Sequence, residues 1–344
     1  MREDEIKSVL KPEYLESVQK AYKNCFEDFL NPSRQLANVV GMGIGVKWKD
    51  NKPTGEPALI VLVTHKKAKE QLSSSDLIPA KMSGFQTDVM PIGHPFAGGG
   101  APAASAQTLA ARVRPVKGGY SIGHRNVTAG TIATCVFEML PKAGSSENSR
   151  PYKFYILSNN HVLAKNNLAK IGDPIIQPGA EDGGSYPGDR IATLSRFIPI
   201  EFDPPVPRNR HNNLVDAAIA EGDFHELDSE IYWIGHVKGW MPKANVTVGE
   251  QVQKTGRTTN YTIGRITAVN ATIDINYGSG KIARFKDQII TTGMSAGGDS
   301  GSLVTTMDNV AVGLLFAGSP SATIINQIEN VRKLLHIEIP GGRM

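Results

Sequence analysis

The chain has 344 residues, of which 40% are hydrophobic and 20% are charged, and its formal net charge at pH 7 is +4. This is the composition of a globular protein with a sizeable core, and so small a net charge indicates no nucleic-acid-binding surface. Because no apolar run approaches the roughly 20 residues of a membrane-spanning helix, we expect neither nucleic acid nor a membrane among the partners.

The cysteine content and the first residues bear on the cellular compartment. Only two cysteines occur, Cys25 in a predicted helix and Cys135 in a predicted strand, and so few are typical of a reducing environment. Residues 1–5 are mostly charged and no apolar stretch follows them, so we expect no secretory signal peptide. Together these observations predict a cytoplasmic protein.

The N-terminal part begins with a predicted helix over residues 3–30. It is interrupted once, and Pro12 suits the first turn of its second segment. Apolar residues recur there every three or four positions as far as Leu30, which predicts a stripe that packs on the domain itself. A small α/β unit is predicted to follow over residues 37–93, with strands at 38–46, 58–64 and 87–92 and a short helix at 68–72.

Two glycine-containing segments punctuate this part of the chain. The series Gly41-x-Gly43-x-Gly45 is not a dinucleotide-binding fingerprint, because a hairpin rather than a helix follows it. Gly, Ala, Pro and Ser dominate residues 95–106, where no periodicity is visible. We therefore divide the chain into an N-terminal helix with a small α/β domain (1–95), a linker (96–115) and a C-terminal domain (116–344).

The C-terminal domain consists of short predicted strands separated by turn residues, a pattern typical of all-β barrels. We expect a first barrel at about 118–222 and a second at about 246–338. Residues 324–335 carry apolar side chains at helical spacing and predict a closing helix.

Three stretches of this domain carry candidate catalytic residues. An apolar strand that ends in polar residues is followed by His161. A second strand contains Asp216 among apolar neighbours, where a buried carboxylate needs a partner such as a histidine Nδ1–H. A turn of small residues presents Ser300 before an apolar strand, and the N–H groups of Gly298 and Ser300 in that turn can point at one developing oxyanion.

The octet Gly297-Gly298-Asp299-Ser300-Gly301-Ser302-Leu303-Val304 resembles the nucleophile loop of trypsin-like (chymotrypsin-fold) serine peptidases, with Ser302 in place of the final glycine of the pattern Gly-Asp-Ser-Gly-Gly. The order His161, Asp216, Ser300 is also the chymotrypsin order. The resemblance covers roughly residues 115–338 and is to the disulfide-free bacterial type with an N-terminal α/β domain. It implies a mainly β fold, with two six-stranded β-barrels of the chymotrypsin/trypsin type preceded by a small α/β domain with an N-terminal helix.

The resemblance also implies a function and a set of site residues. A serine endopeptidase would use Ser300 as nucleophile, His161 as general base and Asp216 to orient the imidazole, with no metal or cofactor. The amides of Gly298 and Ser300 would form the oxyanion hole. The substrate would lie against residues before the nucleophile and on the strand after it: Met294, Ser295, Phe316, Ala317 and Gly318. Because no carboxylate stands six residues before Ser300, we expect a neutral, small or apolar P1 residue.

Other interpretations stay open at this stage. The same fold could serve as a catalytically silent scaffold or binding protein, and the same triad could act as an esterase. His124 is expected to be structural. The two carboxylates in the loop at 178–184 offer too few oxygen ligands in a fixed spacing for calcium. Asp299 is satisfied either by local backbone and side-chain groups or by a terminus created by processing between about residues 96 and 120.

In the first case the N-terminal domain is a regulatory, assembly or substrate-presenting module rather than a removable propeptide. Partners of the chain are then a protein or peptide substrate and, through the N-terminal domain, a second copy of the chain or a regulatory protein.

Overall fold

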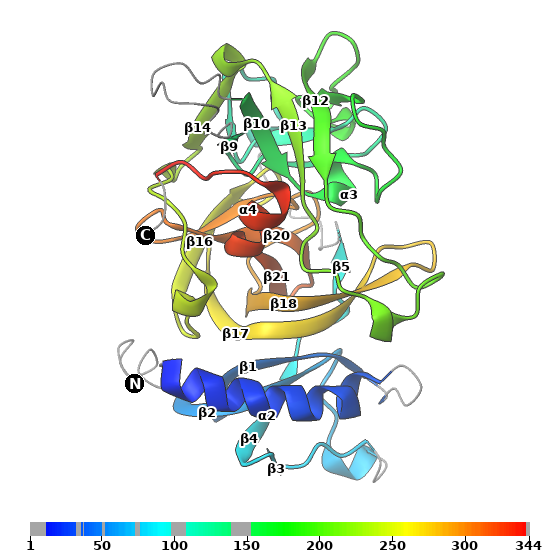
Figure 1. The fold of residues 1–344 in the computed structure, drawn as a ribbon, viewed down its shortest axis with the longest axis vertical. Coiled ribbons are helices and arrows are strands. Elements are labelled where there is room, and N and C mark those ends of the chain that lie inside the picture. The colour runs from blue at the N-terminus through cyan, green and yellow to red at the C-terminus, as the bar shows by residue number, and fades with distance from the viewer. Residues whose placement is uncertain are drawn as a thin grey trace, which may run out of the picture.

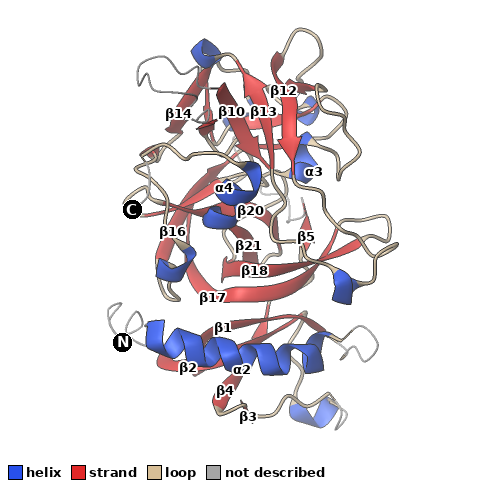
Figure 2. Ribbon diagram, viewed as in Figure 1, coloured by secondary structure: helices blue, strands red, loops and turns tan. Residues whose placement is uncertain are grey.

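The computed structural model describes residues 12–31, 36, 38–49, 52–72, 76–97, 108–138 and 153–341, and within them the fold is mainly β (Figures 1 and 2). The helices are α2 (Pro12–Leu30), α3 (Asn160–Leu163) and α4 (Ile328–Leu335). None of the helices in this part of the chain combines the length and the apolar content needed to cross a bilayer. Cys25 and Cys135 are both free and buried.

The second barrel is a closed sheet of six strands in the middle of the molecule (Figure 1). Its order is β16-β19-β20-β21-β18-β17, and β17 pairs back onto β16. Strand β20 is apolar and buried along its whole length, as expected where both faces are covered. The strands are β16 (Gln251–Gly256), β17 (Asn260–Asn276), β18 (Ile282–Thr292), β19 (Leu303–Thr306), β20 (Ala311–Gly318) and β21 (Ala322–Gln327).

The first barrel is built in the order β8-β7-β11-β12-β13-β10-β9. Two of these, β8 and β9, are successive pieces of one path over 130–138, and the amide of Ala133 between them donates to the carbonyl of Leu157 at 2.9 Å. Counted as one strand they close a six-stranded barrel. The strands are β7 (Ser121–His124), β8 (Gly130–Thr131), β9 (Cys135–Glu138), β10 (Lys153–Ser158), β11 (Pro174–Ile176), β12 (Arg190–Phe197) and β13 (Ala218–Gly222). The expected fold of two six-stranded barrels behind a small α/β unit is therefore confirmed.

The N-terminal unit extends the sheet of the second barrel. Its strands are β1 (Val39–Lys49), β2 (Lys52–Val63), β3 (Lys81–Met82) and β4 (Phe85–Pro91). Strand β1 pairs antiparallel with β2 on one side and with β17 on the other, and β2 pairs parallel with β4. A Cβ on Gly45 would lie 2.6 Å from the carbonyl oxygen of Thr267 on β17, so this glycine permits the close approach of β1 to the barrel.

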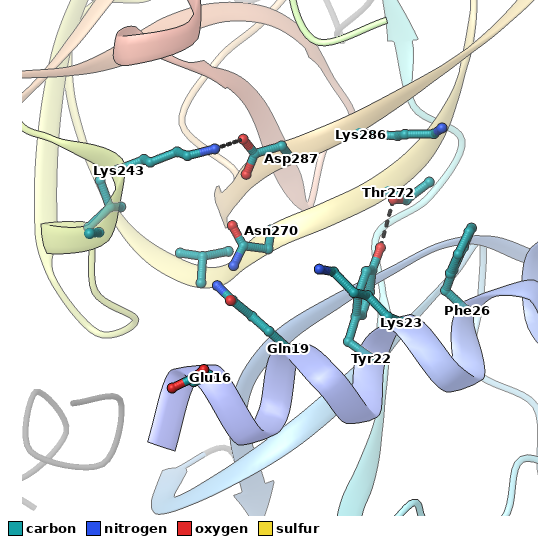
Figure 3. A pocket seen from close by; sticks show the side chains of 13 residues that line it. Glu16, Gln19, Tyr22, Lys23, Phe26, Lys243, Asn270, Thr272, Lys286 and Asp287 are labelled. Carbon is teal, nitrogen blue, oxygen red and sulfur yellow. Dashed lines mark hydrogen bonds and ion pairs between the residues drawn. The ribbon is translucent and has the colours of Figure 1, made fainter. Parts of the chain in front are cut away.

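Helix α2 covers β1 and lies beside β17 (Figure 3). The hydroxyl of Tyr22 on α2 donates to Oγ1 of Thr272 on β17 at 2.6 Å, and burial raises the pKa of Tyr22 to about 12. A groove of about 610 Å³ remains between α2, β17 and the Lys243–Ala244 segment. Because α2, β1, β2 and the second barrel share one hydrophobic cluster, the N-terminal unit is packed against the barrel rather than held on a free tether. The predicted domain boundaries stay predictions.

Three smaller segments complete the fold. Strands β6 (Val116–Gly118), β14 (Leu227–Ile231) and β15 (Gly235–His236) form a separate three-stranded sheet. The expected helix at 68–72 is a single 3-10 turn. Within the expected linker, residues 98–107 lie outside the described residues, but β5 (Phe96–Ala97) is a strand paired with β17 and β20.

The closing helix is shorter than the sequence predicts. Residues 324–327 belong to β21, which pairs with both β18 and β20, and α4 begins only at Ile328. The prediction was wrong here because the adjacent isoleucines Ile324 and Ile325 fit the apolar face of a helix and a strand covered on both faces equally well. From Ile328 onward the expected apolar face is present, with Ile328, Val331 and Leu335 buried.

Candidate active site

The pairing of β10 with β13 determines where His161 and Asp216 lie. Leu157 and Ser158 at the end of β10 face Ile219 and Ala218 of β13 in antiparallel register. His161 follows the end of β10 on α3, and Asp216 precedes the start of β13. Two residues that are 55 positions apart in the sequence therefore meet at the same end of the first barrel.

The imidazole of His161 is bound to a fully buried carboxylate. Nδ1 of the ring lies 2.6 Å from Oδ2 of Asp216, and the backbone amide of His161 donates to Oδ1 of the same carboxylate at 3.1 Å. The hydroxyl of Tyr277, just after β17, donates to Oδ2 at 2.7 Å. Burial, followed by the charge of Asp216, raises the pKa of Tyr277 well above its usual value, so its hydroxyl remains a donor. Three donors thus compensate a carboxylate that water does not reach.

The backbone of Asp216 is fixed as well. Its amide donates to Oδ1 of Asn326 on β21 at 3.0 Å, and its carbonyl accepts from Nδ2 of Asn159 at 2.7 Å. Asn326 in turn donates to Oε1 of Gln288 on β18 at 2.7 Å. The aspartate of the first barrel is therefore positioned by side chains of the second barrel, and no local sequence pattern indicates this arrangement.

The turn that presents Ser300 is attached to the first barrel. The carbonyl of Ser300 accepts from the amide of Thr131 at 2.7 Å, and the carbonyl of Thr131 accepts from Oγ of Ser158 at 2.8 Å. Gly301 has φ of +98°, and a Cβ there would overlap Thr131 and Ser158, so only glycine fits. Through Thr131, the serine turn is thus joined to the strand end that precedes His161.

The hydroxyl of Ser300 donates to the carbonyl of Phe316 at 3.5 Å. Nε2 of His161 is buried and makes no hydrogen bond within the described part of the chain. The Ser300 hydroxyl is thus bonded to a backbone carbonyl rather than to His161; in enzymes the hydrogen bond between nucleophile and base often tightens only when substrate binds. His161 therefore has one nitrogen held by Asp216 and the other available to accept a proton.

Two amides in the serine turn are available to a ligand. The amides of Asp299 and Gly301 donate to the carbonyls of Ala296 and Leu315 at 3.1 and 2.9 Å. Among the described residues, no hydrogen bond is formed by the amides of Gly298 and Ser300. These are the two N–H groups that the sequence predicts as an oxyanion hole, and unlike the neighbouring amides of Asp299 and Gly301 they remain as donors.

Asp299 has a buried cation as its partner. Oδ2 of Asp299 lies 3.2 Å from Nζ of Lys254 on β16, and both side chains are 0% exposed. Oδ1 accepts from the amides of Thr258 and Thr259 at 2.9 and 3.1 Å, and Oδ2 accepts from the amide of Ala296 at 3.0 Å. Asp299 is therefore satisfied by local backbone and side-chain groups, the first of the two alternatives, rather than by a terminus created by processing. Sequence reasoning missed Lys254, although a lysine within a barrel strand was a usable signal.

The predicted substrate-binding residues lie in two groups. Phe316, Ala317 and Gly318 are consecutive on β20, where the ring of Phe316 packs against Phe285 in the core with centroids 4.7 Å apart. The carbonyl of Phe316, rather than its ring, is therefore the part that approaches Ser300.

The other group lies just before the serine turn. The Met294 side chain is buried in the hydrophobic core and lies beside Gly264 of β17. Oγ of Ser295 lies 2.7 Å from Oγ1 of Thr323, and a Cβ on Gly318 would be 3.0 Å from that Ser295 oxygen. A pair of hydroxyls thus lies beneath Gly318, and Thr323 is a further residue that the sequence did not indicate.

The other candidate groups have structural partners. Nε2 of His124 lies 3.2 Å from Asp173, and burial lowers the pKa of His124 against the opposing effect of that carboxylate. In the loop at 178–184, Asp182 accepts from Nε of Arg257 at 2.8 Å, so this carboxylate faces a guanidinium.

One further cluster within the described residues has metal-ligating side chains: Asp228, Glu230 and His236. Nζ of Lys117 lies 2.5 Å from Glu230 and 3.9 Å from Asp228. A single ammonium thus faces both carboxylates of the cluster and offsets one of their two negative charges.

Comparison with known proteins relates the chain by sequence to a bacterial endopeptidase. No protein-family model matches the chain. Glutamyl endopeptidase 2 of Streptomyces griseus is 48% identical over 58 residues, which is 17% of this chain and 28% of that protein. The chain therefore matches little more than a quarter of the length of this relative. The resemblance to bacterial peptidases that the motifs predict is confirmed over this stretch.

Solved structures of similar proteins are more distant. Protease A of Thermobifida fusca is 17% identical with a TM-score of 0.43, covering 65% of this chain and 97% of that chain. A glutamic acid specific serine protease, described as using a histidine triad in substrate binding, is 21% identical with a TM-score of 0.44, covering 65% of this chain and 100% of that chain. The two-barrel architecture described above rests on the strand pairings of the chain itself.

Proposed function

We propose that the chain is a serine endopeptidase that hydrolyses peptide bonds through an acyl-enzyme. The observation that carries this proposal is the 2.6 Å contact between Nδ1 of His161 and the buried Asp216. It holds the imidazole in one tautomer and leaves Nε2 to act as a base. The serine turn and its two unpaired amides supply the nucleophile and the oxyanion donors that such chemistry needs.

In the proposed reaction, His161 Nε2 takes the proton of Ser300 while Oγ attacks the scissile carbonyl carbon. The amides of Gly298 and Ser300 hold the oxyanion of the tetrahedral intermediate, and His161 returns the proton to the leaving amine. Water then attacks the acyl-enzyme by the same sequence and releases the carboxylate product. Asp216 orients the imidazole and stabilises the imidazolium, with the Tyr277 hydroxyl as its third donor.

The side chains around Gly318 favour an uncharged P1 side chain. The Ser295–Thr323 hydroxyl pair beneath Gly318 carries no charge to compensate a lysine, an arginine or a carboxylate. The relative found by sequence is named a glutamyl endopeptidase, and this name supports cleavage after glutamate as the alternative. We propose a neutral, small or apolar P1 residue for this chain.

The test is digestion of a proteome-derived peptide library by the wild-type chain and by Ser300→Ala. We expect cleavage by the wild type after small or apolar residues, and a loss of kcat on the order of 10⁴ to 10⁶ in the variant. Equal cleavage by both proteins would contradict the assignment, and strong preference for Lys, Arg or Glu would overturn the P1 proposal. Turnover of esters without amides would indicate an esterase, and no turnover of either would indicate a scaffold protein.

We further propose that the chain works in a reducing, cytoplasmic compartment with its N-terminal unit attached. The two free, buried cysteines and the shared cluster between α2 and the second barrel support this proposal. The unit then serves regulation, assembly or substrate presentation. Cell fractionation together with the intact mass of the recovered chain tests it, and a secreted or truncated form would contradict it.

A further inference from the structure

The edge of β20 next to the serine turn carries a strand from the N-terminal part of the chain. In β5, Ala97 faces Ala317 and Phe96 faces Gly318 in antiparallel register. The next residue of β20, Phe316, is the one whose carbonyl accepts from the hydroxyl of Ser300. Strand β5 therefore runs along this edge toward Ser300, the candidate nucleophile.

Contacts on both sides hold β5 in this place. The carbonyl of Pro95 accepts from the amide of Asn276 on β17 at 3.2 Å. The ring of Phe96 is 3.5 Å from where a Cβ on Gly278 would be. Upstream, the hydroxyl of Ser319 donates to the carbonyl of Ile92. The segment from Ile92 to Ala97 thus follows the end of β20 from Ser319 inward, and Figure 1 shows β5 beside the second barrel, apart from β3 and β4.

We propose that Phe96–Ala97 is an internal occupant of the edge to which a peptide substrate binds, so that the chain competes with its own substrates. This inference rests on the proposed function. A peptide cleaved by Ser300 would add a strand to the same edge. If the residue opposite Phe316 is P1, then Ala97 stands at P2 and Phe96 at P3.

This competition raises the apparent KM for peptide substrates. A substrate reaches the edge only in the fraction of molecules in which β5 has left, so the apparent KM is raised by the inverse of that fraction. Because β5 is tethered and has only two residues, a longer substrate strand displaces it without a cut in the chain. The occupancy therefore limits affinity and leaves the chemical step unchanged.

The experiment compares peptide hydrolysis by the full-length wild type, Phe96→Gly and Ala97→Pro. The first variant removes the ring from Gly278, and the second removes a backbone donor from the strand. Phe96 is 37% exposed, so the fold of Phe96→Gly is expected to survive, whereas Ala97 is buried and the fold of Ala97→Pro is checked by circular dichroism. Leu77→Gly is the matched control, because it removes a side chain that is 42% exposed in the same unit and lies outside the strands that pair with β20.

We expect both variants to lower KM about fivefold or more with unchanged kcat, and the control to match the wild type. A synthetic peptide of residues 91–97 should inhibit the variants competitively and the wild type more weakly. A wild type that is inactive while either variant is active would equally support the inference. Equal KM values for all four active proteins, with unchanged circular dichroism, would overturn it and leave the proposed function intact. Absence of hydrolysis in all four would instead overturn both.

Discussion

The buried pair of Lys254 and Asp299 gives the sharpest prediction about how the serine turn is held. Lys254→Met removes the ammonium 3.2 Å from a carboxylate that is 0% exposed. Breaking a buried pair by deleting one partner typically costs about 3–5 kcal/mol, because the remaining charge is uncompensated. Asp299 retains hydrogen bonds from Thr258, Thr259 and Ala296, so we expect the lower end, about 3 kcal/mol.

Asp299 lies directly between Gly298 and Ser300, so this cost falls on the turn that carries the nucleophile. If it shifts the turn away from its competent conformation, 3 kcal/mol corresponds to a loss of kcat/KM on the order of 10². The assay is hydrolysis of a cleaved peptide, with thermal unfolding measured in parallel. The double variant Lys254→Met/Asp299→Asn should recover part of the stability, because it removes both charges. Activity of Lys254→Met within twofold of the wild type, with an unchanged Tm, would refute this reasoning.

The same lysine predicts a pH dependence. Burial lowers the pKa of Lys254 below 10.5, against the opposing effect of Asp299. The folded chain therefore loses this proton at a lower pH than the unfolded chain, and activity should fall as pH rises through the lowered pKa. Over the pH range between the two pKa values the unfolded chain binds more protons than the folded chain. The free energy of unfolding should therefore rise with pH in that range, while the activity falls. Lys254→Arg should move the alkaline limb of the activity profile upward, and an unmoved limb would contradict this origin.

Three further predictions concern single residues. Tyr277→Phe removes a donor to the buried Asp216, so kcat should fall about 10- to 100-fold with little change in KM, as measured on one peptide; an unchanged kcat would show that the hydroxyl is dispensable. Gly301→Ala forces a Cβ into Thr131 at a φ of +98° and should both lower the Tm and reduce activity by more than tenfold, so a variant with wild-type Tm would contradict the geometry. Burial lowers the pKa of His124, so on acidification the unfolded chain binds this proton first and the stability should fall as pH drops through about 6.5. His124→Gln should flatten the plot of stability against pH in that range. The same slope in the variant and the wild type would contradict this origin.

Alternation, turn residues and the small-residue octet are local signals, so the sequence was sufficient to predict the barrels and to indicate three catalytic candidates, whose roles stay predictions. It was not sufficient for Lys254 and Tyr277, since their roles come from partners that lie 45 and 61 positions away. The start of α4 could not be placed because buried strands and helices share the same apolar run near Ile325. The pairing of β5 with β20 joins residues more than 200 positions apart, and a Gly/Ala/Pro-rich stretch gave no strand signal.

The central claim is that Ser300 is a nucleophile activated by His161. The most direct measurement is covalent labelling of the folded, full-length chain with a fluorophosphonate probe, followed by peptide mapping of the adduct. We predict stoichiometric labelling at Ser300 in the wild type and a loss of labelling in His161→Ala. Leu77→Gly, an exposed change far from the site, should label like the wild type. No labelling of the folded wild type, or labelling of Ser300 that persists at the same rate without His161, would contradict the account.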